Sequence, residues 1–455
     1  MAILNTGYSF KKIHSIFKSA KRIFFIGIGG VSMSALARYC VYMGKEVFGY
    51  DRVRSKESAR LESICSIKYY STPDNVCGMD MVIYTGAIDG DNFEYKRAME
   101  LEIPTLSRAN FLGYVVSRYE GRIGVAGMHG KSTTTAMLSS VFTYAGKSPT
   151  VFCGASMQGV ETTGIIGVGG DCIFEACEYT NSFHSLPVKD AVILNIDYDH
   201  PDFFKSMEQI KESFQRYIRD AERVFINADD ENSSQLYHKN IITYGLKNGT
   251  YRAKIIHSTD KTEGNTGKTF ALMKGDEELC VCSLRLGGEH MVYDALCALA
   301  VSLENGIEPK TACEALSAFE GTGRRMEKIG KTPKGVAVFE DYAHHPREIE
   351  CTLGELKRQY GTVMCVFQPH TYSRTHFLYG GFVESLSLAD ELIITETYSA
   401  REENVYGVSE KALATDAGGI FLPDMCAISK QIKESDCGVI VIMGAGDIYR
   451  LRKYL

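Results

Sequence analysis

The sequence predicts an α/β protein of three domains. Its 455 residues are too many for one hydrophobic core. Apolar segments of strand length alternate with helical segments through most of the chain, and polar or glycine-rich loops follow several of the strands. Because α/β sheets bind ligands at the carboxyl ends of their strands, we expect the functional residues in these loops. We place the domains at residues 1–119, 120–320 and 321–455.

The composition excludes some classes of protein. Hydrophobic residues at 45% and charged residues at 23% are ordinary for a globular protein. A net charge of −6 gives no general attraction to nucleic acid or anionic membranes, and no apolar run approaches the roughly 20 residues of a membrane span. The fourteen cysteines form no C-x-x-C motif, so we expect buried free thiols in a cytoplasmic protein that binds neither nucleic acid nor membrane.

The first domain opens with a Rossmann-like unit. We predict a strand at 22–28, a glycine loop, a helix at 35–43 and a strand at 46–50 that ends at Asp51. In such units the acidic residue after the second strand binds a ribose hydroxyl. Ser32 replaces the third glycine of the dinucleotide fingerprint, so the loop alone does not establish a nicotinamide site.

Two later segments of this domain supply polar groups. A strand at 81–84 precedes Thr85, and a strand near 103–104 precedes Ser107 and Arg108. Arg108 is a candidate contact for a phosphate or sugar. The alternative is a solvated arginine at the start of a helix.

The central domain begins with a phosphate-binding loop. A strand at 122–126 leads into Gly127-Met128-His129-Gly130, and Lys131-Ser132 then starts a helix. The unpaired N–H groups of a helix N-terminus attract phosphate oxygens. Lys131 can reach terminal phosphates, and the Ser132 hydroxyl can ligate magnesium. Val125 stands where the general pattern has a glycine, which leaves a ligand-free turn as the alternative. We interpret the loop as a nucleoside-triphosphate site.

Acidic and histidine side chains follow the next strands. A strand at 171–176 leads to Glu178, and a strand at 191–196 leads into the loop 197–202. Magnesium usually takes one or two carboxylates together with phosphate oxygens. Glu178 with Asp199 or His200 would supply such a shell near the phosphate loop, whereas an acidic loop considered alone is more often simply solvated.

The rest of the central domain changes character. Short alternating segments at 251–257, 269–273 and 279–284 predict antiparallel hairpins within or beside the domain. A helix at 290–304 follows, and the glycine-rich stretch 320–323 marks the next boundary.

The third domain returns to alternating strands and helices. We predict strands at 337–339, 363–367, 391–395 and 438–443. Polar clusters follow three of them, at 341–346, 368–375 and 444–447. A single histidine is usually structural, but three clusters at strand ends favour a binding edge.

The loops together resemble one known family. The segments GIGGVSMSA, YTGAI, LSRANFLG, GMHGKSTT, NIDYDHPDFF, DYAHHPRE, FQPHTYSRT and GAGDIY look, in this order, like the Mur ligase family. The resemblance implies a Rossmann-like domain for a UDP-sugar, a central P-loop ATPase domain and a C-terminal Rossmann-like domain for an amino acid. It implies ATP and Mg²⁺ as cofactors and a cytoplasmic monomer or homodimer in peptidoglycan precursor synthesis. The expected substrates are UDP-N-acetylmuramate and L-alanine; a different amino acid or a preformed peptide is the alternative.

The resemblance also assigns residues to ligands. For the UDP-sugar it implies Gly27, Gly29, Gly30, Ser32, Met33, Ser34, Asp51, Thr85, Ser107 and Arg108. For ATP it implies Gly127, Met128, His129, Gly130, Lys131, Ser132, Thr133, His290, Asp294 and Arg325. For magnesium it implies Ser132, Glu178 and His200, and for the amino acid Tyr342, His344 and Arg374. The catalytic group would be Lys131, Glu178, His200, Arg325 and His344.

The chain departs from the family pattern at four of these loop positions. Met128 replaces a usual threonine, Met291 and Asp294 replace two asparagines, and Thr371 replaces an arginine. The last change leaves Arg374 as the expected partner of the amino-acid carboxylate.

Two other classes of protein explain less of the chain. A nicotinamide oxidoreductase would account for the loop from Gly27 to Asp51 but leaves Lys131 without a purpose. A non-catalytic nucleotide-binding regulator would account for Lys131 but not for the C-terminal histidine and arginine clusters. Carboxylate activation by ATP accounts for both, because phosphorylation brings two anions together and needs positive charge around them.

Overall fold

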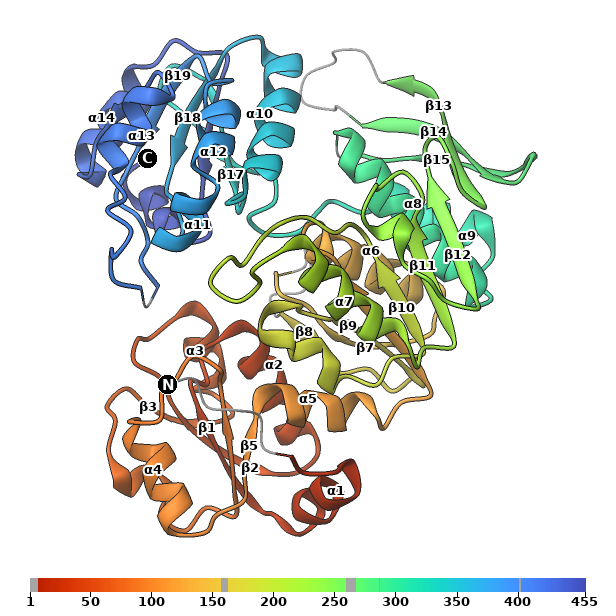
Figure 1. Ribbon diagram of the computed structural model, residues 1–455, viewed down its shortest axis with the longest axis vertical. Helices are drawn as coiled ribbons and strands as arrows, with labels where there is room; N and C mark the ends of the chain where they lie inside the picture. The colour runs from red at the N-terminus through yellow and green to blue at the C-terminus, as the bar shows by residue number, and fades with distance from the viewer. Residues whose placement is uncertain (1–6, 157–162, 259–266, 286, 401) are drawn as a thin grey trace.

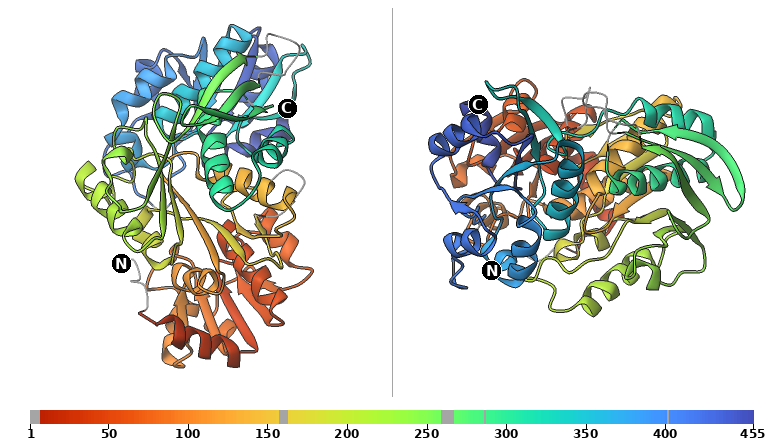
Figure 2. Two further views of the ribbon diagram at one scale, coloured as in Figure 1. Left: turned by 90° about the vertical axis from the view of Figure 1, so that its right-hand side faces the viewer. Right: turned by 90° about the horizontal axis from the view of Figure 1, so that it is seen from above.

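Three sheets organise the chain. The computed structural model describes residues 7–156, 163–258, 267–285, 287–400 and 402–455. Each sheet belongs to one successive part of the chain, so the predicted α/β fold with three domains is confirmed. The N-terminal domain lies at one end of the molecule and the C-terminal domain at the other (Figures 1 and 2). The predicted limits at 119 and 320 fall between the sheets.

The N-terminal sheet has five parallel strands in the order β3-β2-β1-β4-β5. Its elements are α1 (Phe10–Ser19), β1 (Arg22–Ile26), α2 (Val31–Tyr42), β2 (Glu46–Tyr50), α3 (Lys56–Leu61), β3 (Ser66–Lys68), η1 (Pro73–Val76), β4 (Met81–Tyr84), α4 (Phe93–Glu100), β5 (Thr105–Ser107) and α5 (Arg108–Val116). Strand β1 ends two residues earlier than predicted because Gly27 turns the chain with a φ of 82°. Helix α2 begins four residues earlier than predicted, directly after Gly30.

The central sheet has ten strands in the order β15-β14-β13-β12-β11-β10-β6-β9-β7-β8. Its elements are β6 (Gly121–Ala126), α6 (Lys131–Tyr144), β7 (Thr150–Phe152), β8 (Gly164–Ile165), β9 (Asp171–Glu175), η2 (Tyr179–Ser185), β10 (Asp190–Ile193), α7 (Met207–Ile218), β11 (Arg223–Asn227), η3 (Ser233–Gln235), β12 (Ile241–Gly245), β13 (Tyr251–Ser258), β14 (Lys268–Lys274), β15 (Glu277–Ser283), α8 (Glu289–Glu304) and α9 (Pro309–Ser317). Strands β13 to β15 pair antiparallel, as the hairpin pattern predicts, and they extend the main sheet.

The C-terminal sheet has six strands in the order β16-β17-β21-β18-β19-β20. Its elements are β16 (Glu327–Lys331), β17 (Ala337–Asp341), α10 (Pro346–Tyr360), β18 (Val363–Phe367), α11 (Tyr372–Phe377), α12 (Tyr379–Leu386), β19 (Glu391–Ile394), α13 (Glu410–Asp416), β20 (Ile420–Phe421), α14 (Met425–Glu434), β21 (Val439–Met443) and η4 (Ile448–Tyr454). Only β16 pairs antiparallel within this sheet, at its edge.

Eight cysteines are buried free thiols, as expected: Cys40, Cys65, Cys153, Cys172, Cys282, Cys297, Cys365 and Cys437. Five others differ from the expectation. Cys280 and Cys313 are paired as a disulfide, because α9 packs on β15 and brings together two residues that lie 33 positions apart. Cys77, Cys351 and Cys426 are exposed free thiols. The missing C-x-x-C motif could not reveal a pair made by tertiary packing.

Among the described residues, no helix is both long and apolar enough to cross a membrane.

Candidate active site between the central and C-terminal domains

The phosphate loop joins β6 to α6 through a tight turn. Gly130 precedes α6 with a φ of 83°, which favours glycine. A Cβ atom at Gly130 would also lie 2.6 Å from Oδ1 of Asp294, so α8 packs directly against the loop. Asn195, just after β10, fixes the loop: its side-chain oxygen accepts the His129 N–H at 2.9 Å, and its side-chain NH₂ donates to the His129 carbonyl at 3.0 Å. Side chains of neighbouring segments therefore hold the loop backbone in shape before any phosphate arrives.

A buried chain of charges lies beside the loop. Lys131 Nζ is 3.0 Å from Glu178 Oε2, and Glu178 Oε1 is 3.2 Å from His200 Nε2. Burial alone would raise the pKa of Glu178, but Lys131 and His200 outweigh it and lower that pKa to about 2. Glu178 is therefore ionised at neutral pH. The structure thus brings together Lys131, Glu178 and His200, which sequence analysis placed at separate strand ends.

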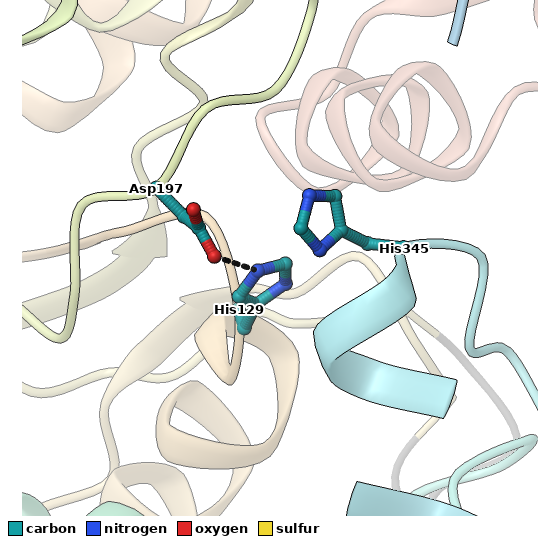
Figure 3. Close-up of side chains that lie close together, drawn as sticks. All are labelled: His129, Asp197 and His345. Atoms are coloured by element: carbon teal, nitrogen blue, oxygen red, sulfur yellow. Dashed lines mark ion pairs between the residues drawn. The ribbon is translucent and has the colours of Figure 1, made fainter. Parts of the chain in front are cut away.

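His129 faces two carboxylates from different domains. Its Nε2 lies 3.6 Å from Asp197 Oδ2, the ion pair drawn in Figure 3, and its Nδ1 lies 3.3 Å from Glu348 Oε1. Burial opposes the imidazolium, but Asp197 and Glu348 raise the pKa of His129 to about 9. The loop therefore carries a positive charge beside Lys131 at neutral pH.

A cavity of about 420 Å³ extends from the loop between the two domains. His129, Gly130 and Thr133 line it from the loop side. The predicted ATP residues His290, Asp294 and Arg325 also line it. Met128 is instead buried in the core, and Ser132 does not line the cavity.

Burial changes the chemistry of α8. It raises the pKa of Asp294 to about 7 and lowers the pKa of His290. Asp294 is thus an acid that can be neutral near pH 7, beside a loop that would hold phosphates. A usual asparagine would be neutral at every pH.

The C-terminal side of the cavity is organised by Glu348 on α10. Its Oε1 lies 3.3 Å from Nη1 of Arg325, and its Oε2 lies 3.1 Å from Nδ1 of His344. The guanidinium of Arg325 also sits 5.1 Å above the ring of Tyr342. Arg325 and His344 therefore meet at one carboxylate, and Tyr342 lies beside the Arg325 guanidinium.

Arg374 forms a buried ion pair across the domain boundary. Its Nε and Nη2 donate to the two carboxylate oxygens of Asp199 at 2.8 and 3.2 Å. Both side chains are about 5% exposed. Thr371, at the position of the usual arginine, adopts a φ of 66° and donates its N–H to Tyr398 O. The predicted carboxylate partner is thus already paired with a carboxylate of the protein.

The loops predicted for the UDP-sugar meet at the carboxyl edge of the N-terminal sheet. Gly29 N–H donates to Asp51 Oδ2 at 2.8 Å, and Arg108 Nη1 donates to Ser32 Oγ at 3.2 Å. A Cβ atom at Gly27 would lie 2.6 Å from Thr85 Cγ2, so these loops are in close contact.

The other predicted UDP-sugar residues have structural positions. Gly30 and Ser107 precede α2 and α5 as capping residues. Met33 and Ser34 are buried, backbone included, so neither is open to a ligand in this structure.

Several residues of the site carried no clear signal in the sequence. Glu348 lies inside a helix, and Asn195 lies inside a segment predicted as strand. Strand β10 ends at Ile193, which places Asn195 in the loop. Asp197 and Asp199 lay in a recognised acidic loop, but their partners His129 and Arg374 are far away in the chain.

The fold combines three parts: a Rossmann-like domain, a domain with a glycine loop, and a third α/β domain that shares a cavity with that loop. This combination defines a class of three-domain P-loop proteins. Family profiles match the three parts: "Mur ligase family, catalytic domain" at residues 22–120, "Mur ligase middle domain" at 125–302 and "Mur ligase, glutamate ligase domain" at 324–446. The chain belongs to the Mur ligase family, and the resemblance read from the loops is confirmed.

Curated relatives match over nearly the whole chain. The UDP-N-acetylmuramate–L-alanine ligase of Caldanaerobacter subterraneus subsp. tengcongensis is 37% identical over 95% of this chain and 96% of its own. The protein of the same name from Caldicellulosiruptor saccharolyticus is 41% identical over 86% of this chain and 87% of its own.

Solved structures agree with the fold. The crystal structure of UDP-N-acetylmuramate-alanine ligase from Thermotoga maritima superposes with a TM-score of 0.81 at 29% identity, covering 95% of this chain and 98% of that one. A murein peptide ligase from Psychrobacter arcticus superposes with a TM-score of 0.71 at 23% identity, covering 95% and 97%. The second likeness concerns the fold alone.

Proposed function

We propose that the chain is an ATP-dependent ligase that joins L-alanine to the carboxylate of UDP-N-acetylmuramate. The observation that carries the proposal is the near-full-length relationship to chains that bear this name, at 37% and 41% identity. The geometry supports it, because cations of two domains flank one cavity.

The first step is phosphoryl transfer to the sugar carboxylate. A carboxylate oxygen attacks the γ-phosphorus of ATP, ADP leaves, and an acyl phosphate forms. Negative charge builds up on the transferred group, and fixed cations stabilise it. Lys131 and His129 stand on the loop and Arg325 lines the same cavity from the opposite domain, so these three side chains would surround the phosphates.

The second step is attack of the amine on the acyl carbon, with phosphate as leaving group. The ammonium must first lose a proton to a base. We assign this role to His344, whose Nδ1 lies close to both Glu348 Oε2 and the carbonyl of Tyr342. A proton held at Nδ1 leaves Nε2 as the acceptor, as in a carboxylate-paired catalytic histidine. His345 is the less suitable base, because burial lowers its pKa to about 4.

The donor set beside the loop fits magnesium. Glu178 offers a buried ionised carboxylate, Ser132 a hydroxyl at the start of α6, and His200 an imidazole next to Glu178. Few protein oxygens together with phosphate and water are the usual shell of this ion. Bound there, magnesium would supply charge neutralisation at the phosphates.

The two remaining substrates have separate sites in the proposal. The UDP-sugar occupies the loop edge of the N-terminal sheet, around Gly29, Asp51 and Arg108. The L-alanine carboxylate binds Arg374, in exchange for Asp199, with Tyr342 and His344 beside it. A bidentate arginine suits a carboxylate best.

The test is phosphate release from ATP by the purified full-length chain. We expect release only when UDP-N-acetylmuramate, L-alanine and magnesium are all present. Glycine, L-serine and a tripeptide in place of L-alanine test the choice of amino acid. Release that depends on the tripeptide and not on L-alanine would move the chain to another Mur ligase activity.

The variant Lys131→Ala tests the phosphate loop in the same assay. It should lower kcat by on the order of 10² or more, because a cation aimed at transition-state charge is lost. UDP-sugar binding should persist, since that ligand uses other loops. Near-normal ligation by a folded variant would contradict the assignment of the phosphate loop.

A further inference from the structure

Two histidines and an aspartate converge at the boundary of the central and C-terminal domains. His129 comes from the phosphate loop, Asp197 from the loop after β10, and His345 from the residue that caps α10. One ligand atom of each lies within 4.8 Å of the others. Figure 3 shows the three side chains turned toward one another from three segments.

The second nitrogen of each ring lies close to an oxygen atom outside the cluster. His129 Nδ1 lies 3.3 Å from Glu348 Oε1, and His345 Nε2 lies 3.3 Å from the carbonyl of Tyr198. Histidines that bind metals commonly donate their second ring N–H to a carboxylate or a backbone carbonyl. Each ring therefore has both features of a metal ligand, a nitrogen directed into the cluster and an oriented outer nitrogen.

The inner nitrogens are His129 Nε2 and His345 Nδ1. His129 Nε2 lies 3.6 Å from Asp197 Oδ2. His345 Nδ1 accepts the N–H of Arg347 at 3.3 Å as the cap of α10, so its single lone pair must leave this long hydrogen bond to bind an ion. The rings of His129 and His345 stand 4.7 Å apart between centroids.

We propose that His129, Asp197 and His345 form a site for one divalent transition-metal ion of the Zn²⁺ type. Two neutral imidazoles and one carboxylate are ligands that zinc accepts, with water or substrate in the fourth position. Binding would therefore displace the proton that His129 carries at neutral pH. Zn–N and Zn–O bonds of roughly 2.0–2.1 Å place tetrahedral ligands about 3.4 Å apart. The His129–Asp197 separation of 3.6 Å is already close to this value, and the other separations, which are at most 4.8 Å, need to shorten by up to about 1.4 Å.

The surrounding charges allow such an ion. Asp197 and Glu348 supply negative charge, while Arg347 Nη1 lies 3.6 Å from Asp197 Oδ2 and competes for it. The Arg347 side chain is 54% exposed, so it can turn into solvent when an ion takes its place. The magnesium donors Ser132, Glu178 and His200 are different residues, and zinc prefers nitrogen ligands more than magnesium does.

The ion would act as a clamp. Two of its ligands belong to the central domain and the third begins α10 of the C-terminal domain. A bound ion would therefore hold the phosphate loop against the opposite wall of the cavity. The ligation reaction itself does not require this link.

The experiment is a calorimetric titration of the full chain with Zn²⁺, in millimolar Mg²⁺ to occupy hard-ligand positions. We expect one ion per chain. His345→Gln and Asp197→Asn should each raise the Kd at least tenfold, the lower end of the roughly 10–100-fold cost of losing even an outer partner of a metal ligand. His238→Gln, on the surface of the central domain, is the matched control and should leave the Kd unchanged.

A second readout keeps the test decisive if a variant is unstable. Co²⁺ in place of Zn²⁺ should give visible absorption bands of a tetrahedral site, lost in the folded His345→Gln variant. Unchanged Zn²⁺ affinity in both His345→Gln and Asp197→Asn would overturn the proposal. So would loss of binding in His200→Gln or Cys351→Ser with full binding kept in His345→Gln, because the ion would then belong to other ligands.

Discussion

The central domain meets its two neighbours through boundaries of opposite character. Toward the N-terminal domain it shares one hydrophobic core, in which Tyr114 and Phe111 of α5 belong with Phe183 and Phe214 of the central domain. Toward the C-terminal domain the contacts are charged or polar, and the two cores of that domain contain C-terminal residues alone. Arg374–Asp199 and His345–Tyr198 cross the second boundary.

The apolar boundary is therefore fixed, whereas the contacts of the polar boundary can be exchanged. Burial of apolar surface is non-directional, and no ligand of this enzyme can replace it. An ion pair can exchange partners, because a substrate phosphate or carboxylate offers the same chemistry as Asp199 or Glu348. We infer that the N-terminal domain stays in place while the C-terminal boundary responds to ligands and pH. The following changes test this comparison, from the largest expected effect to the smallest.

Asp199→Ala should have the largest effect, on stability. It leaves the guanidinium of Arg374 buried without its counter-ion, which typically costs about 3–5 kcal/mol. Urea unfolding of the folded variant measures the loss. The matched control is Asp436→Ala, which removes the exposed pair of Lys334 and Asp436 at 2.6 Å and should cost less than about 1 kcal/mol. Equal small losses in both variants would show that the Arg374–Asp199 pair contributes little.

The polar boundary should weaken in alkali through His129. The pKa of His129 is about 9 in the folded chain against the ordinary 6.5, so its contribution is fully present below pH 6.5. That contribution is lost as pH rises through about 9, in total by up to about 3 kcal/mol. The free energy of unfolding between pH 6 and 9.5 should fall more in wild type than in His129→Gln. If the free energy of unfolding falls equally with pH in both proteins, the charge on His129 does not stabilise the polar boundary.

Arg374→Ala should raise the KM for L-alanine tenfold to a hundredfold. A hydrogen bond to a charged group contributes roughly 1.5–3 kcal/mol, which corresponds to this range. The KM for ATP is the internal control and should stay within about threefold. Steady-state kinetics, at a temperature where the variant is folded, measures both KM values. An unchanged KM for L-alanine would leave Arg374 as a partner of Asp199 only.

Gly113→Ala probes the apolar boundary. A Cβ atom at this position in α5 would lie 2.0 Å from the carbonyl oxygen of Ser185, so the domains must shift apart. Such overpacking typically costs about 1–3 kcal/mol, and the KM for L-alanine should not change.

Gly354→Ala is the matched control, because this glycine of α10 has open space around it. The alanine should stabilise by up to about 1 kcal/mol through its helix propensity. A change in L-alanine KM caused by Gly113→Ala alone would show that the apolar joint also responds to ligands.

The sequence predicted the parts of the site that depend on local pattern. Strand, glycine loop and Lys131 follow one another within a few residues, and the strand ends at Glu178 and Asp51 lie where apolar runs stop. Parallel sheets then place such loops along one edge. For these reasons the fold and the placement of the loops were predictable.

The contacts between domains were not predictable in the same way. Arg374 and Asp199 are separated by 175 positions, and no spacing rule links them. The same holds for His129 with Glu348. These contacts depend on how the folded domains pack against each other, and no local sequence pattern encodes that packing.

The core shared by α5 and the central domain also bears on how the chain folds. Residues 108–116 bury their side chains against a partner outside their own sheet, so the N-terminal domain made alone would expose that apolar face to water. Its folding is then tied to the synthesis of the central domain, whose η2 follows some seventy residues later. The C-terminal domain, with cores of its own, can fold as a separate unit. We expect calorimetry to resolve two cooperative transitions for this three-domain chain, one for the first two domains together and one for the third.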